Sequence, residues 1–328
     1  MVLLLCVGTP LCGAFLLPLI GRRSPKLRNA AALAFVLAAF CLAGVMTARL
    51  LAGGEPLSLG VTLPLGLSMG FNADALALFM ILTAAAVGTV IVVYSFGYMK
   101  EYAHLGEYYM MVTFFIGAMA GLALSTNLIE LYLFWELSSL CSWRLIGFYR
   151  DETSVSRANK AFLVTVFGAL VMLLGFLGVY GAAGTFELAA LKGFTPPLWA
   201  SALILVGILS KSASFPLHNW LPDAGVAPSP VTALLHAAVL VKIGVFAYAR
   251  IFADTFAPQT ALMRIVPIVA AVSALLSAGC ALVATDIKRV VAYSTISQLA
   301  FILLGLSAGG KTGFVGGLLY ILAHSVAK

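Results

Sequence analysis

The sequence predicts an all-α, polytopic bundle of about eleven transmembrane helices. Of its 328 residues, 62% are hydrophobic and only 9% are charged, and the mean hydropathy is +1.08. A soluble domain carries roughly 25% charged residues, so this composition excludes a water-soluble fold. Runs of about 20 apolar residues recur along the chain, and in lipid such runs must form helices because their backbone groups find no water partner.

Eleven apolar runs follow one another with short polar connections. The expected spans are 2–20, 29–50, 74–98, 108–126, 128–148, 160–183, 199–221, 229–249, 264–284, 290–308 and 313–328. The stretch 51–73 is expected to form an external loop, and 184–198 a short interfacial helix that ends at Pro196 and Pro197. The last run has only about 16 residues, fewer than a span needs, so we expect a C-terminally truncated fragment.

The basic residues indicate topology and no nucleic-acid partner. The formal net charge is +7, but lysine and arginine are scattered among the loops and form no basic stripe. With the N-terminus outside, basic residues concentrate in the loops that would lie in the cytoplasm, as the positive-inside rule requires. The five cysteines lie in apolar runs without metal-ligand spacing. We therefore expect an integral protein of a bacterial or archaeal cytoplasmic membrane.

Lys211 lies in the middle of the seventh span, where an ionisable residue is costly and usually functional. A lysine near a membrane surface can extend its ammonium to water, but Lys211 is about equally far from both ends of its span. Pro216 follows five residues later and blocks helical hydrogen bonding. The sequence therefore predicts a broken seventh helix between Ser210 and Pro216, next to a lysine that a carboxylate could control.

Other spans carry further buried titratable groups. Glu136 lies in the fifth span and shares a face with Arg144, which is too far along the helix for a direct ion pair. A structural ion pair with another helix is the alternative role for Glu136. His236 and Lys242 share the eighth span but not one face, because six residues turn a helix by about 240°.

The last run carries His324 and Lys328 at the spacing i, i+4, so both lie on one face. A lone histidine in a membrane is often hydrogen-bonded packing, but five titratable groups after Glu136 favour a proton path. The chain contains no P-loop, no GxGxxG before a helix, no HExxH and no cysteine cluster. We therefore expect no cofactor, metal ion or redox site in it, and whether it belongs to an enzyme complex stays open.

Four stretches carry a resemblance to a known family. They are LYLFWELSSLCSWRLIGFY, LSKSASFPLHNWLPDAGVAPSPVTALLHAAVLVKIGVF, ATDIKRVVAYSTISQLAFILLG and LLYILAHSVAK. The chain resembles the antiporter-like family shared by proton-pumping subunits of respiratory complex I, Mrp-type cation/proton antiporters and membrane-bound hydrogenases. The resemblance implies that Glu136 is the carboxylate of the fifth span and Lys211 its electrostatic partner. It also implies that His236 and Lys242 pass protons to a central axis that contains His324 and Lys328.

The family fold has two inverted repeats of five spans each. The resemblance therefore implies an N-terminal region of three spans at 1–106, a complete first repeat (spans 4–8) at 107–253, and a truncated second repeat at 254–328. It implies a proton-translocating subunit of a redox-driven complex, with other membrane and peripheral subunits as partners. A subunit of a Mrp-type antiporter, which would also move Na⁺, and a non-conducting scaffold are the alternatives.

Overall fold

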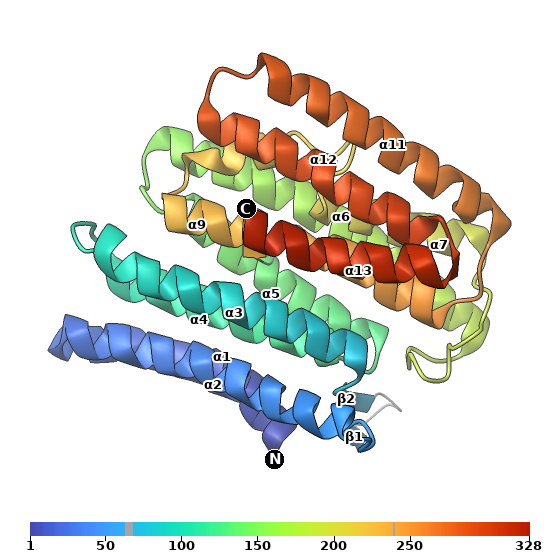
Figure 1. The fold of residues 1–328 in the computed structure, drawn as a ribbon, viewed down its shortest axis with the longest axis horizontal. Helices are drawn as coiled ribbons and strands as arrows, with labels where there is room; N and C mark the ends of the chain where they lie inside the picture. The colour runs from blue at the N-terminus through green and yellow to red at the C-terminus, as the bar shows by residue number, and fades with distance from the viewer. Residues whose placement is uncertain (63–67, 239) are drawn as a thin grey trace.

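The computed structural model describes residues 1–62, 68–238 and 240–328, and it confirms the predicted helical bundle. The long helices lie roughly side by side in layers, with α1 and α2 at one edge and α11 at the other (Figure 1). They are α1 (Val2–Arg23), α2 (Pro25–Leu51), α3 (Ala75–Tyr98), α4 (Leu105–Leu124), α5 (Leu128–Ile146), α6 (Glu152–Ala183), α7 (Leu198–Lys211), α11 (Thr260–Val283), α12 (Ile287–Ser307) and α13 (Gly310–Ala327).

Short helical pieces join α7 to α11. They are α8 (Trp220–Asp223), the 3₁₀-helix η2 (Ala224–Val226), α9 (Ser229–Ala233), the π-helix η3 (Leu234–Ala238), α10 (Lys242–Tyr248) and the π-helix η4 (Ala249–Thr255). The expected eighth span is thus an α-helix with a π-helix on either side. π-helical turns are rare and concentrate at functional sites.

Within the described residues, seven helices are long and apolar enough to cross a membrane: α1, α2, α3, α4, α6, α11 and α12. The other expected spans correspond to helices that are shorter, more polar or interrupted, namely α5, α7, the pieces between 229 and 255, and α13. The chain is therefore an integral membrane protein. The count of eleven spans and the division into repeats at 106 and 253 stay predictions.

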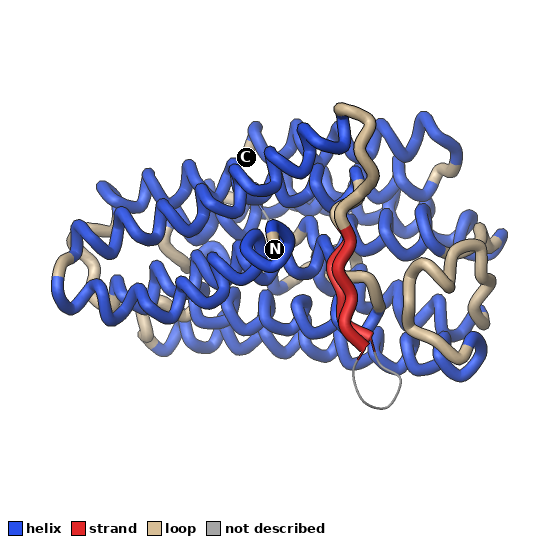
Figure 2. The backbone as a smooth tube through the Cα atoms, turned by 90° about the horizontal axis from the view of Figure 1, so that it is seen from below, coloured by secondary structure: helices blue, strands red, loops and turns tan. Residues whose placement is uncertain are grey.

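The stretch 51–73 contains a β-hairpin where the sequence predicted only a loop. Strands β1 (Ser58–Thr62) and β2 (Ser68–Asn72) pair antiparallel, and they run across the direction of the helices (Figure 2). A side chain at Gly70 would come within 2.6 Å of the Leu59 carbonyl oxygen, so this close pairing requires glycine. Buried Glu130 attaches the hairpin to α5, because its Oε2 accepts hydrogen bonds from the backbone N–H groups of Gly70 and Thr126.

The prediction of an interfacial helix at 184–198 was wrong, because helical structure begins only with α7. Residues 184–197 form turns, and Glu187 makes an isolated β-bridge with Asn127. Leu188 N–H donates to the Thr126 carbonyl, and Leu128 N–H donates to the Phe186 carbonyl. Backbone pairing with the α4–α5 connection therefore replaces the helical bonds that the composition favoured.

Helix α7 ends at Lys211, so the interruption predicted between Ser210 and Pro216 is present. Residues 212–219 form turns before α8 begins at Trp220. Ser212 N–H still donates to the Ile208 carbonyl, but Ala213 has a positive φ of 50° and its N–H donates to the Ser210 carbonyl, which ends the α-helical pattern. Pro216, further along, has no N–H for the Ser212 carbonyl. The last helical residue is therefore Lys211 itself.

Glycines bring α6 and α7 close together around this end. A Cβ at Gly168 would lie 1.9 Å from Ser210 Oγ, and one at Gly207 would lie 2.5 Å from Met172 Cβ. Small residues at such contacts let membrane helices approach closely, where packing stabilises them. The position of Lys211 is therefore determined from the α6 side by backbone contact.

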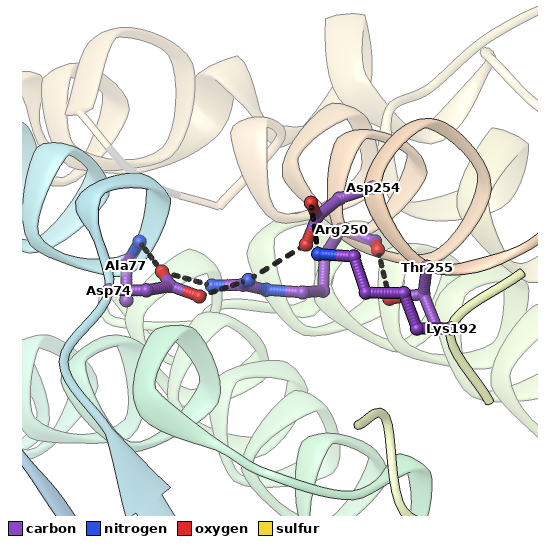
Figure 3. A network of polar contacts seen from close by, with 6 residues as sticks. All are labelled: Asp74, Ala77, Lys192, Arg250, Asp254 and Thr255. Carbon is purple, nitrogen blue, oxygen red and sulfur yellow. Dashed lines mark hydrogen bonds and ion pairs between the residues drawn. The ribbon is translucent and has the colours of Figure 1, made fainter. Parts of the chain in front are cut away.

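An ion network joins three distant segments near the end of η4 (Figure 3). Arg250 donates to both carboxylate oxygens of Asp74, at 2.5 and 2.8 Å, and its Nη1 lies 3.3 Å from Asp254. Asp74 also caps α3 by accepting from Ala77 N–H, and Lys192 lies 3.6 Å from Asp254. The Arg250 side chain is only 7% exposed, so Asp74 is its main compensating charge.

We expect Asp74→Ala to lower the free energy of unfolding by about 2 to 4 kcal/mol, because it removes a helix cap and leaves a buried arginine short of a partner. Lys192→Ala is the matched control: Lys192 is 70% exposed, and its ion pair is worth roughly 0.5 kcal/mol. Denaturation of the purified protein in detergent measures both. Equal stabilities of the two variants would contradict the structural role of the Arg250–Asp74 pair.

Candidate functional site

Lys211 is fully buried against α5. Its ammonium Nζ donates to Ser139 Oγ at 2.6 Å and to the Trp135 carbonyl oxygen at 3.3 Å. It also lies 5.5 Å from the centroid of the Trp135 ring. We call these three groups the lysine cradle. All three are uncharged, and together they offer the ammonium two hydrogen-bond acceptors and an aromatic face.

Glu136 is the next residue after Trp135, and its charge acts on Lys211. The described ion pairs do not include one between Glu136 and Lys211 within 4.0 Å. Glu136 Oε1 is buried and has no hydrogen-bond partner in the part of the chain that the structure describes. The structure therefore brings the two predicted partners together, and it shows the ammonium bound to neutral groups beside an unpaired carboxylate oxygen.

Lys242 begins α10 and is also fully buried. Its Nζ donates to the hydroxyl of Ser325 on α13, which in turn donates to the Ile321 carbonyl. The neighbouring His324 is buried on α13, one position before Ser325 and one turn before Lys328. Lys242 therefore contacts the turn of α13 that carries His324, and with His236, which lines one cavity together with Lys328, these four predicted site residues form one group.

His236 lies in η3 and is buried, and Lys328 Nζ donates to Ser294 Oγ of α12 at 2.7 Å. Among the described residues, both ring nitrogens of His236 and both of His324 are buried without a hydrogen-bond partner. A cavity of about 190 Å³ reaches this group; its lining includes Ser229, Thr232, His236, Lys288 and Lys328. Buried polar atoms are normally satisfied, so ordered water is the partner that these imidazoles require.

Arg144 does not belong to this group. Its guanidinium forms an ion pair with Glu107 of α4, which also pairs with Arg150 at 2.6 Å. Arg144 shares a helix with Glu136, but its charge is compensated at the end of α5 near the connection to α6. The ion pair on this helix is therefore that of Arg144, and the alternative structural role for Glu136 has no partner among the described residues.

No three His, Cys, Asp or Glu side chains lie together as metal ligands in the described ranges. The five cysteines are free thiols. The expectation that the chain holds no metal ion, cofactor or redox site stays a prediction.

Sequence reasoning missed the direct partners of the two central lysines. Ser325 follows His324 and carries no signal of its own, because one serine in an apolar helix is common. Ser139 lies at i+4 from Trp135, and its hydroxyl donates to the Trp135 carbonyl, a local bond typical of membrane serines. That local role conceals the second role, as an acceptor for Lys211, which only the packing of α5 on α7 reveals.

Comparison with known proteins places these residues in a family. The family model for the transmembrane region of NADH:quinone oxidoreductase and Mrp antiporters matches residues 125–328. The model for the N-terminus of complex I chain 5 matches residues 62–109. NAD(P)H-quinone oxidoreductase chain 5 from Picosynechococcus sp. is 37% identical over 275 residues, which are 80% of this chain and 41% of the relative.

The corresponding subunit 5 from the chromatophore of Paulinella chromatophora is 34% identical over 97% of this chain and 51% of the relative. The chain thus spans about half or less of the curated relatives that it matches. Among solved structures, the Mrp complex from Dietzia sp. matches with a TM-score of 0.89 and 28% identity, over 99% of this chain and 36% of that one.

The archaeal membrane-bound sulfane sulfur reductase has the same fold. It matches with a TM-score of 0.89 and 23% identity, over 99% of this chain and 68% of that one. The resemblance of the sequence is therefore confirmed, with the helix that carries Glu136, the broken helix that carries Lys211 and the helices that carry Lys242 and His324 all inside the matched region. The chain belongs to the NADH:quinone oxidoreductase/Mrp antiporter transmembrane family.

Proposed function

We propose that the chain moves protons through the membrane as a subunit of a redox-driven, multi-subunit complex. The observation that carries this proposal is the burial of Lys211, His236, Lys242 and His324 in one bundle. A lysine at the centre of a membrane helix costs about 2.5 to 3.5 kcal/mol or more. A protein that only scaffolds its neighbours gains nothing from four such groups, so their function lies in binding and releasing protons.

The contacts suggest an order for the proton path. Lys211 and Glu136 form one charged unit between α5 and α7, and Lys242, His324 and His236 form a second between α10 and α13. The cavity at His236 and Lys328 is the route by which water would reach the second unit. Helices α7 and α10, which carry Lys211 and Lys242, pack against each other at Gly244, and we propose that a change of charge in one unit is felt in the other. Electron transfer then takes place in partner subunits, whose chemistry drives these charges.

A cation/proton antiporter is the second candidate, and the similarity to the Mrp complex from Dietzia sp. favours it. The two candidates differ in what drives and accompanies proton movement. Proton flux through the native complex that requires an electron donor, and is unchanged when Na⁺ is replaced by choline, supports the redox-driven function. Flux that requires Na⁺ and no electron donor supports the antiporter. We also propose a bacterial or archaeal cytoplasmic membrane with the N-terminus outside, and the distribution of basic residues supports this orientation.

Lys242→Met tests proton transfer directly. We expect proton flux through the assembled native complex to fall at least about 100-fold, because a proton-transfer group contributes about that much and methionine cannot carry a proton. Lys192→Met is the control, since Lys192 is 70% exposed and lies outside the buried group. A pH-sensitive dye inside sealed vesicles measures the flux. Wild-type flux in assembled Lys242→Met would defeat the proposed path.

A further inference from the structure

We propose that Ser139 is a positioning residue that holds the Lys211 ammonium away from Glu136 between proton transfers. The proposal rests on the proposed function and adds a second binding position for the lysine. Two partners compete for one ammonium: the lysine cradle, which is neutral, and the Glu136 carboxylate. In the structure the ammonium is in the cradle, 2.6 Å from Ser139 Oγ, and forms no ion pair with Glu136 within 4.0 Å.

The geometry makes Ser139 the only side-chain acceptor in the cradle. The other acceptor is the Trp135 carbonyl oxygen, at the longer distance of 3.3 Å, and the third group is the Trp135 ring. Ser139 Oγ uses its own hydrogen to donate to that same carbonyl at 3.2 Å, so its lone pairs are directed to Lys211. A hydroxyl placed in this way can only accept from the ammonium.

Burial makes this contact effective. Ser139 and Lys211 are both fully buried, so water does not compete for the ammonium in the cradle. A hydrogen bond to a charged group is stronger than one between neutral groups, so it can balance an ion pair whose partners must both lose their hydration. The cradle thus provides a position in which Lys211 stays charged while Glu136 is open to another proton.

Few other titratable groups face Lys211. On α5 these are Glu136 and the buried thiol of Cys141. Helix α6 carries its charged residues in its first turns, at Glu152, Arg157 and Lys160, and Lys160 pairs with Asp223 at 2.7 Å. From α10, Lys242 is bound by Ser325. Changes at Ser139 are therefore expected to act through the balance between the cradle and Glu136.

Ser139→Ala removes one arrangement that stabilises the charged lysine, so the proton on Lys211 is held less tightly. We expect the alkaline limb of the pH–flux profile to move by about one unit to lower pH. Ser139→Thr keeps the hydroxyl and should restore the wild-type profile. Ser201→Ala is the matched control on α7, because Ser201 lies ten residues before Lys211 and its buried hydroxyl accepts a hydrogen bond from Gln259. Loss of this hydroxyl should leave the pH–flux profile unchanged.

Cryo-electron microscopy of the native complex with Ser139→Ala gives a readout that does not depend on flux. We expect the Lys211 ammonium to move into an ion pair with Glu136, within about 4 Å. A lysine that stays against the Trp135 carbonyl, with an unchanged pH profile, would overturn the proposal. If Ser139→Ala does not assemble, Ser139→Cys keeps the size and replaces a good acceptor by a weak one, and the same two shifts are expected.

The two proposals fail in different ways. Loss of the proposed function appears as wild-type flux in Lys242→Met, whatever Ser139 does. Failure of the cradle appears as normal pH dependence and an unmoved lysine in Ser139→Ala, in a complex whose flux still depends on Lys242.

Discussion

Replacing Lys211 by methionine should abolish proton flux while the complex still assembles. Lys211 is the one titratable side chain that contacts α5 next to Glu136 from the broken end of α7, within the described residues. Methionine has nearly the same length and fills the same apolar volume, so α6, α7 and α10 keep their packing. It carries no charge and binds no proton, so Glu136 loses its electrostatic partner and the path loses one of its two proton-binding groups in the first unit.

We expect a fall in flux of at least about 100-fold, measured with a pH-sensitive dye in sealed vesicles at equal amounts of assembled complex. Lys100→Met is the matched control, because that lysine is 68% exposed in a connection and pairs with its neighbour Glu101. Lys211→Arg should recover little, since a planar guanidinium does not fit the position that a compact ammonium occupies between Ser139 and Trp135. Assembled Lys211→Met complex with normal flux would remove Lys211 from the mechanism.

The fold class could be predicted from composition because lipid permits so few backbone structures. An apolar content of 62% and repeated runs of about 20 residues leave a helical bundle as the only solution for a chain with these charges. An interruption between Ser210 and Pro216 was also predictable, since Pro216 cannot donate a helical hydrogen bond to the Ser212 carbonyl. Local rules of this kind need no knowledge of tertiary contacts.

Contacts between distant segments could not be predicted in the same way. The π-helix at 234–238 changes the angle between His236 and Lys242, so a helical wheel with 3.6 residues per turn does not place them. The hairpin of β1 and β2 depends on Gly70, where a side chain would collide with the Leu59 carbonyl oxygen, and on Glu130 from α5. The binding of Lys242 to Ser325 joins residues 83 positions apart. Each of these features depends on packing between segments that are far apart in the sequence, so no local pattern predicts it.

The same difference between local and tertiary information explains why the sequence revealed the titratable residues but not their hydrogen-bond partners. A lysine or histidine in a membrane run is conspicuous because its burial is costly. The hydroxyls that compensate it are ordinary residues of membrane helices, and they satisfy their own backbone as well. Candidate residues such as Lys211 and Lys242 can thus be read from one sequence, whereas Ser139 and Ser325 require the structure.

Gly244→Val should prevent correct folding more completely than any change to a charged residue. Gly244 lies on α10, two residues after Lys242, and faces the last turn of α7. A Cβ there would lie 2.7 Å from the Ile208 carbonyl oxygen and 2.8 Å from Ser212 N. Both are backbone atoms that no rotamer change can move, so the two helices must separate at the level of both lysines.

We expect Gly244→Ala to cost about 1 to 3 kcal/mol, as overpacking usually does, and Gly244→Val to yield little monodisperse protein in detergent. Gly181→Val is the matched control, because no atom lies within 4 Å of a Cβ at that position of α6. Size-exclusion chromatography and thermal unfolding measure both. If Gly244→Val folds as well as Gly181→Val, the close contact of α7 and α10 is not required. A different result is that Gly244→Val fails to fold while Gly244→Ala folds with reduced flux. The distance between α7 and α10 would then set how strongly the charge on Lys211 acts on Lys242, because this interaction weakens as the two lysines move apart.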